Sequence, residues 1–328
     1  MSQTGREESR VVQATRAGAP EESRYRPFRR LLINIWKHRM FYVFILPGIV
    51  FYFIFSYIPM YGALIAFKDY SYSKGILGSP WAGLKYFREF FSFYQSWNIL
   101  RNTVLISFLK ILFGFPAPII LALMLNEVRH ALFKRVVQTV SYLPHFISWV
   151  VVVTLMQRML TPYGGPVNNL LESLGYEKIF FMGNPSYFYQ LIIMSDIWKH
   201  VGWGSIIYLA AIATIDQEQY EAAVIDGAGR FKQMIYITIP GISGIMAILL
   251  ILQIGGLMSA GFEQLLLMNN PATASIGTVI DVYVIQAGIR EGRFSYSAAV
   301  GLFQSVVSLI LIFLANRFAR KVGAVSLW

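Results

Sequence analysis

Cysteine is absent from the 328 residues, and charged side chains make up only 14% of them. Without cysteine the chain can form no disulfide, no thiolate metal site and no cysteine nucleophile. It also contains no GxxxxGK[ST] sequence, so it lacks the loop with which P-loop proteins hold ATP. What is present instead is apolar: 56% of the residues are hydrophobic. This balance is typical of a membrane protein.

Residues suited to catalysis are also scarce. The four histidines show no HExxH spacing, and Asp196 is the one carboxylate within the apolar runs. A membrane enzyme would need paired carboxylates, a metal-binding set or a nucleophile with its base. We therefore expect no catalytic residue, no metal ligand and no cofactor bound by this chain. A membrane-embedded enzyme such as a glycosyl transferase is the alternative from another class, and an ion channel would need a filter sequence that is not visible.

Six apolar runs are long enough to cross a bilayer, which predicts an all-α membrane protein. The first measures about 40 Å at 1.5 Å per residue, so it must tilt or protrude from a hydrocarbon core of about 30 Å. A basic tail (residues 1–40) precedes the membrane domain (41–315), and a short tail (316–328) follows it. The predicted spans are 41–67, 103–125, 140–160, 187–213, 241–262 and 296–315.

The net charge of +11 is concentrated beside these runs rather than spread over the chain. With six spans, both tails and the 126–139 and 214–240 connections lie on one side. This side carries most of the Lys and Arg, so the positive-inside rule makes it cytoplasmic. Basic residues in the 68–101 connection weaken the rule locally. The N-terminal basic cluster is expected to bind anionic lipid, not nucleic acid.

The stretch from Thr214 to Pro240, TIDQEQYEAAVIDGAGRFKQMIYITIP, is too polar to be a span although it lies between two of them. Thr214 or Asp216 can cap a first helix, and Gly227 with Gly229 can end it in a sharp turn. A second short helix would run over 231–237, with Pro240 opening the next span. The pattern predicts a helix–turn–helix held outside the bilayer to contact another molecule.

This stretch resembles a known motif. Glu221-Ala222-Ala223, three residues, Gly227, nine residues and Ile237, then Pro240, is similar to the EAA loop of importer-type ABC transporter permeases. The form EAAVIDGAG with a later ITIP resembles the carbohydrate-uptake branch. Nearly all of residues 25–328 resembles permeases of bacterial oligo- and polysaccharide importers, those of the alginate importer among them.

The resemblance implies a type I importer permease with six transmembrane helices in the bacterial inner membrane, both termini cytoplasmic. Such a chain forms half of a translocation pathway beside a second permease, expected to be a different chain. Two ATPase subunits hold ATP and Mg²⁺, and an extracytoplasmic solute-binding protein delivers the saccharide. A permease for a non-sugar solute is the nearer alternative. The coupling residues implied are Glu221, Ala222, Ala223, Asp226, Gly227 and Pro240.

Ionisable groups within spans are costly and therefore candidates for function. The resemblance places solute contacts on the spans that flank the 214–240 loop, which gives Asp196, Lys199, His200, Trp203 and Gln253. Asp196 and Lys199 are i,i+3 neighbours, so a mutually neutralising structural pair is an equal reading. Trp203 can stack on a sugar ring or simply pack.

The positive bias of the spans suggests an acidic saccharide such as alginate. Lys199, His200 and Arg158 would offer the counter-charge to its carboxylates, and Asp196 alone would reduce this positive charge. In the competing reading Asp196 neutralises Lys199, while Arg158 extends its charged end to a membrane interface. Lys110, within the second span, is likewise expected to extend its charged end to an interface.

Overall fold

The structure is a computed structural model that describes residues 36–323 and 325–327. In these residues helices dominate, and the extended pairing amounts to one isolated bridge between Lys68 and Trp81. The expected all-α membrane fold is therefore confirmed. The chain divides into two compact units, one up to Gly62 and one from Ala63 onward. Of the predicted basic tail, residues 1–35 lie outside the described part.

The described part of the first unit is one long apolar helix with a change of winding. α3 (Arg39–Tyr52) continues through a π-helical turn (Phe53–Tyr57) into α4 (Ile58–Met60). The widened turn precedes Pro59, whose missing N–H cannot bond to the carbonyl of Phe55. None of these residues is buried within the chain.

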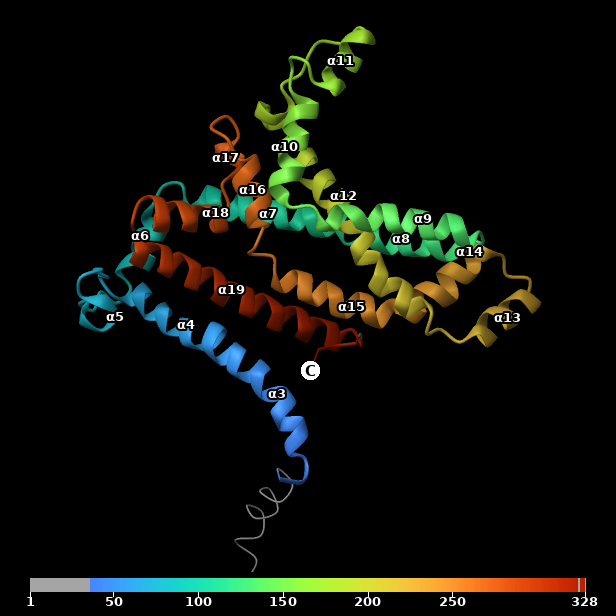
Figure 1. Ribbon diagram of the computed structural model, residues 1–328, viewed down its shortest axis with the longest axis horizontal. Coiled ribbons are helices and arrows are strands. Elements are labelled where there is room, and N and C mark those ends of the chain that lie inside the picture. The colour runs from blue at the N-terminus through green and yellow to red at the C-terminus, as the bar shows by residue number, and fades with distance from the viewer. Residues whose placement is uncertain (1–35, 324, 328) are drawn as a thin grey trace, which may run out of the picture. The chain divides into compact units, whose positions relative to one another are not determined.

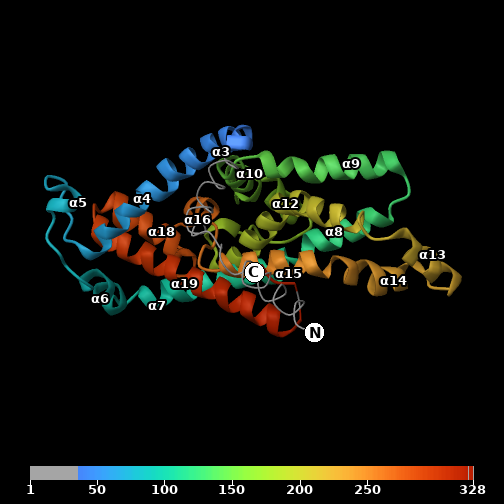
Figure 2. The ribbon, with the colours of Figure 1, turned by 90° about the horizontal axis from the view of Figure 1, so that it is seen from below.

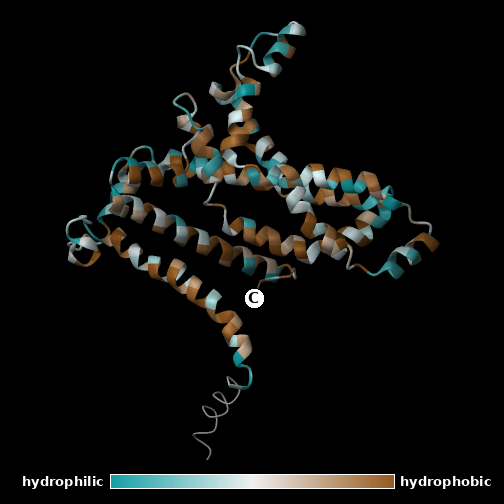
Figure 3. Ribbon diagram, viewed as in Figure 1, coloured by the Kyte–Doolittle hydropathy of each residue, from teal (hydrophilic) through white to brown (hydrophobic). Residues whose placement is uncertain are grey.

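The second unit is a bundle built around one central helix. α12 (Pro185–Ile212) packs against α7 (Ser96–Gly114), α8 (Pro116–Glu127), α9 (Ala131–Tyr142) and α15 (Ile239–Gly255), and α19 (Phe294–Lys321) packs on α15. Figure 1 shows α8, α15 and α19 extending along broadly the same direction, whereas α12 crosses them obliquely. Figure 2 shows the same helices from below. Most of α15 is hydrophobic in Figure 3, whereas much of α13 (Gln217–Ile225) is hydrophilic.

Span number follows from length and hydropathy. Four helical segments of the described chain qualify: 39–67, 96–127, 230–255 and 294–321, with α9 and α10 (Trp149–Leu160) as a fifth if counted as one broken span. α12, which fills the predicted fourth span, carries several polar side chains and is not among them. The count of six thus stays a prediction.

Two of the expected spans differ from the prediction. The run 140–160 is not straight, because the segment Ala131–Phe146 and α10 meet at an angle of 101°. Pro144 begins a 3-10 turn (Leu143–Phe146), and Ser148 then caps a new helix by accepting from the Val151 N–H. The run 241–262 ends early as a helix, at Gly255, where two consecutive glycines favour termination.

The connection 263–295 is far more ordered than its sequence suggests. It contains α16 (Phe262–Met268), α17 (Ala274–Gly277) and α18 (Ile280–Ile285). Leu265 and Val279 are fully buried in one hydrophobic core with Ile192 of α12. This connection therefore builds the interior of the second unit.

The 68–101 connection carries two short helices, α5 (Gly75–Gly78) and α6 (Lys85–Ser92). Lys68 donates to the carbonyls of Ile76 and Leu77 near the end of α5. Lys85 and Tyr86 both donate to Asp69, and these hydrogen bonds, with that from Lys85 the stronger influence, lower the pKa of the Asp69 carboxyl. Two of the basic residues that weakened the orientation rule thus have local acceptors.

The polar stretch 214–240 forms the predicted helix, turn and second helix. α13 begins at Asp216, whose carboxylate accepts from the Glu218 N–H. It ends in a Schellman motif: Ala228 donates to Ala223, Gly227 donates to Val224, and Gly227 takes a φ of +74°. The second helix differs, since α14 (Arg230–Gln233) runs through a π-helical turn (Met234–Thr238) directly into α15.

Candidate functional site

A polar cavity of about 370 Å³ lies inside the second unit, where α7, α8, α12 and the end of α15 converge. Its size and its mixture of polar and apolar lining fit a small-molecule binding site. The residues that line it are Ser107, Lys110, Ile111, Gly114, Pro118, Asp196, Ile197, His200, Val201, Gly204, Gln253, Gly256, Leu257 and Ser259.

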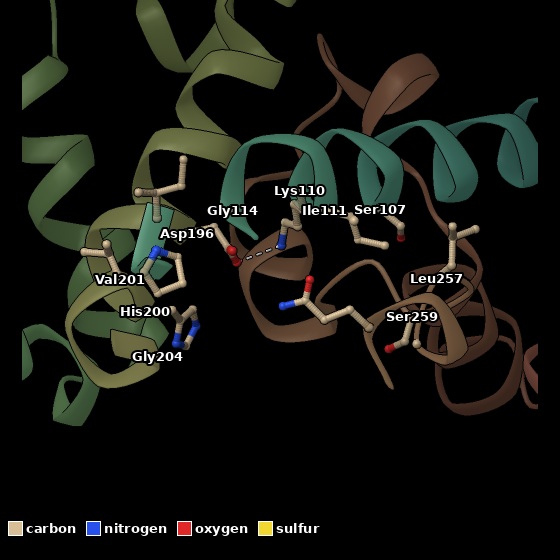
Figure 4. Close-up of a pocket in the computed structure, with 14 residues that line it drawn as sticks. Ser107, Lys110, Ile111, Gly114, Asp196, His200, Val201, Gly204, Leu257 and Ser259 are labelled. Atoms are coloured by element: carbon tan, nitrogen blue, oxygen red, sulfur yellow. Dashed lines mark ion pairs between the residues drawn. The ribbon is translucent and has the colours of Figure 1, made fainter. Parts of the chain in front are cut away.

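An ion pair joins two walls of this cavity. The Lys110 ammonium of α7 lies 3.1 Å from an Asp196 carboxylate oxygen of α12, and Figure 4 shows the two side chains pointing toward one another. Lys110 also donates to the side-chain oxygen of the fully buried Gln264, at 2.5 Å. The Gln264 amide in turn donates to the Ile192 carbonyl and to Ser195. Three helices are tied together by this network.

Lys110 was expected to extend to a membrane interface, and that expectation is wrong. Its side chain is only 13% exposed because a carboxylate and an amide oxygen inside the bundle compensate its charge. Gly261 makes room for it: the residue has a φ of +96°, and a Cβ there would lie 2.6 Å from the Lys110 nitrogen. These partners could not be predicted from local patterns, since the three elements are separated by about 70 residues or more.

Lys199 has a different environment from the one expected. It does not pair with Asp196. Its ammonium donates to the backbone carbonyls of Pro144, His145 and Ile147, which form the corner between the segment Ala131–Phe146 (the α9 segment) and α10. The Pro144 carbonyl also accepts from the Ile147 N–H, whereas carbonyls at a helix end commonly lack a backbone donor, so a cation satisfies this group well. The Lys199 ammonium also lies 5.6 Å from the centre of the Trp149 ring. We interpret Lys199 as a structural residue of this corner.

Aromatic rings surround the same corner. The Nδ1 atoms of His145 and His200 are 3.3 Å apart, and the Trp203 indole stacks on His145 with ring centres 4.7 Å apart and nearly parallel. Trp203 therefore has a protein ring on one face. It does not line the cavity.

The sequence-predicted pathway residues thus divide into two groups. Asp196, His200 and Gln253 line one cavity, whereas Lys199 and Trp203 belong to the neighbouring corner. The sequence reasoning missed Ser107 and the place of Lys110 on the cavity wall, both on α7. Their i,i+3 spacing on one helix face was the available signal.

A second candidate site is the exposed end of the 214–240 stretch. Glu221, Ala222, Asp226, Gly227 and Pro240 are exposed, and Ala223 is partly so. Large apolar side chains are exposed beside them: Val224, Ile225, Phe231 and Tyr236.

One ion pair joins this stretch to the bundle, and one hydrogen bond braces the stretch internally. Arg230 lies 3.6 Å from Glu127 at the end of α8, and within the stretch the Tyr220 hydroxyl is 2.9 Å from that of Thr238. An exposed apolar surface on a fixed support is typical of a protein-binding site.

Comparison with known proteins identifies the family. Residues 114–324 match the model of the binding-protein-dependent transport system inner membrane component. The chain belongs to this family. It is 49% identical to protein LplB of Bacillus subtilis (strain 168), over 87% of this chain and 90% of that protein. It is 48% identical to the polygalacturonan/rhamnogalacturonan transport system permease protein YteP of the same organism, over 90% and 92%.

Solved structures give the same result. A chain of a bacterial alginate ABC transporter, crystallised with an alginate pentasaccharide-bound periplasmic protein, is 38% identical. Its TM-score is 0.83, with 91% of this chain and all of that chain covered. A chain from another crystal structure of a bacterial ABC transporter for import of the acidic polysaccharide alginate is 39% identical, with a TM-score of 0.82 and coverage of 89% and 99%.

These relatives establish what kind of protein this is. It is a permease subunit of a sugar ABC importer in the bacterial inner membrane, crosses that membrane several times, and is not itself an enzyme. Membership of this family implies a partner permease, an ATPase and a solute-binding protein. The membrane-enzyme alternative is not favoured.

Proposed function

We propose that this chain forms half of the translocation pathway for an oligo- or polysaccharide, and that the saccharide is acidic. The polar cavity lined by Lys110, Asp196, His200 and Gln253 is the observation that carries the proposal, because it lies on the helices that flank the 214–240 stretch. Relatives named for alginate and for polygalacturonan/rhamnogalacturonan transport support the acidic class.

In this proposal the second permease is a different chain and completes the pathway. Two ATPase subunits bind ATP and Mg²⁺, and this chain binds no cofactor. Both termini and the 214–240 stretch face the cytoplasm, as the distribution of Lys and Arg supports. Lys199 and Trp203 belong to the pathway only as the corner that supports His200.

The coupling residues proposed are Glu221, Ala222, Ala223, Asp226, Gly227 and Pro240, which would dock in a cleft of the ATPase. The exposed apolar side chains Val224 and Ile225 support this docking. Gly227 is informative because a Cβ there would meet no atom of the described residues within 4 Å. A side chain at this position can therefore act only through the turn geometry or through a partner.

Substitution of Gly227 tests the docking. Gly227→Leu should abolish saccharide uptake by the complete transporter in proteoliposomes while the solute-binding protein keeps its affinity. Gly227→Asn separates an effect on the turn from an effect on the partner contact. Asparagine tolerates positive φ, so it retains the turn while it adds a side chain. The matched control is Gly229→Ala, where the space is equally open and φ is an ordinary −70°. Normal uptake by Gly227→Leu would contradict the assignment.

The incomplete transporter gives a second test. Reconstituted alone, this chain should neither hydrolyse ATP nor move solute, since it supplies half a pathway and no nucleotide site. Adding the partner permease, the ATPase and the loaded binding protein should restore both activities. Solute flux through the chain alone would refute the proposal.

A further inference from the structure

We propose that Lys110 is the counter-charge for a uronate carboxylate in the pathway and that Asp196 is its resting partner, exchanged when the saccharide enters. The inference rests on the proposed function and names the residues that select the acidic class. Of the described residues that line the cavity, Lys110 is the only lysine, and none is an arginine. A carboxylate that enters this space therefore meets one permanently charged cation.

The ammonium has a donor to offer. It carries three N–H groups; in the described part of the chain Gln264 accepts a hydrogen bond from it, and Asp196 lies beside it as an ion-pair partner. The remaining N–H can contact an incoming carboxylate before the Asp196 contact is given up. Because Gly261 has no side chain, the space on its side of this nitrogen stays open.

A second, independent observation lies one helical turn away. Ser107 lines the same cavity and is 4% exposed, yet its hydroxyl has no hydrogen-bond partner within the described chain. A buried hydroxyl without a partner is unfavourable by itself, so a ligand oxygen would improve its state. Ser107 and Lys110 are i,i+3 neighbours on α7, and a hydroxyl and a carboxylate of one saccharide can reach both.

Asp196 explains how such a site can release its ligand. A transport site must bind weakly enough for the solute to leave, and an unpaired buried cation would hold a carboxylate too firmly. Asp196 neutralises Lys110 while the cavity is empty and competes with the incoming carboxylate for it. Loss of Lys110 and loss of Asp196 therefore have opposite effects on binding.

The test measures binding of an oligouronate, a trimer of galacturonate or of alginate, to the purified complete transporter without its binding protein. Lys110→Met should weaken binding at least about tenfold, which corresponds to about 1.4 kcal/mol. Asp196→Asn should tighten it. Ser107→Ala should weaken it by a smaller factor. Lys134→Met on α9 removes a lysine that does not line the cavity and serves as the control.

A second comparison tests whether the effect depends on the carboxylates of the ligand. For the methyl-esterified trimer, which lacks the carboxylates, Lys110→Met should bind as the wild type does. If Lys110→Met and Asp196→Asn change binding in the same direction, or change the acid and its ester alike, the pair is structural and the inference is wrong. Failure of the wild-type transporter to import any saccharide with its binding protein would instead overturn the proposed function.

Discussion

Two lysines of this permease are removed from water in different ways. Lys110 is compensated by side chains, the carboxylate of Asp196 and the amide of Gln264, at the wall of a cavity. Lys199, 5% exposed, is compensated by three backbone carbonyls at the corner between the α9 segment and α10. Side-chain partners can rotate away, whereas backbone carbonyls are fixed by the fold. The first arrangement suits exchange with a ligand, and the second suits support.

The largest expected effect in this comparison comes from removing the fixed lysine. Lys199→Met leaves carbonyls of the corner without a donor, at about 1–3 kcal/mol for each one that water cannot reach. We expect loss of thermal stability and of assembly with the partner permease, measured by size-exclusion chromatography after heating. Lys134→Met is the control. If the variant assembles normally and only acidic saccharides are affected, Lys199 serves the solute and the contrast fails.

An intermediate effect is expected where the corner packs on α12. A Cβ at Gly202 would lie 2.0 Å from the backbone oxygen of Ser141, and backbone cannot give way as a flexible side chain does. Gly202→Ala should therefore lower the free energy of unfolding by about 1–3 kcal/mol, the usual cost of overpacking. The same substitution at Gly301, where the space is open, is the control. Equal thermal stability of the two variants would show that the corner adapts.

The smallest effect on stability should come from the exchangeable side. At Gly261 a Cβ would meet the movable end of Lys110, and the positive φ adds some backbone strain. Because the ammonium can shift, Gly261→Ala should alter binding of the oligouronate more than assembly. Comparison of binding with the melting temperature checks this. If Gly261→Ala loses assembly as Lys199→Met does, the surroundings of Lys110 are as structural as those of Lys199, and the contrast between the two lysines is wrong.

The sequence predicted the helical membrane class and the form of the 214–240 stretch because both depend on local patterns. Glu221-Ala222-Ala223 and Gly227 define a helix and its Schellman end within a dozen residues. The partners of Lys110 and Lys199 were not predictable in this way. They come from segments 50 to 150 residues away, and i,i+3 spacing favoured the nearest carboxylate, Asp196, for Lys199. Burial of the 263–295 connection was missed because it has no long apolar run.

The continuity of α14, the π-helical turn and α15 has a mechanical consequence. Together they form one helical rod from Arg230 to Gly255, 26 residues or about 39 Å long. One end carries the exposed 214–240 surface, and the other carries Gln253 at the cavity wall. A helix resists axial compression, so a push on Arg230 reaches Gln253 with little loss. The π-helical turn at Met234–Thr238 is the one place along this rod where its winding is wider, and it lies just before Pro240, so we expect the rod to bend there first.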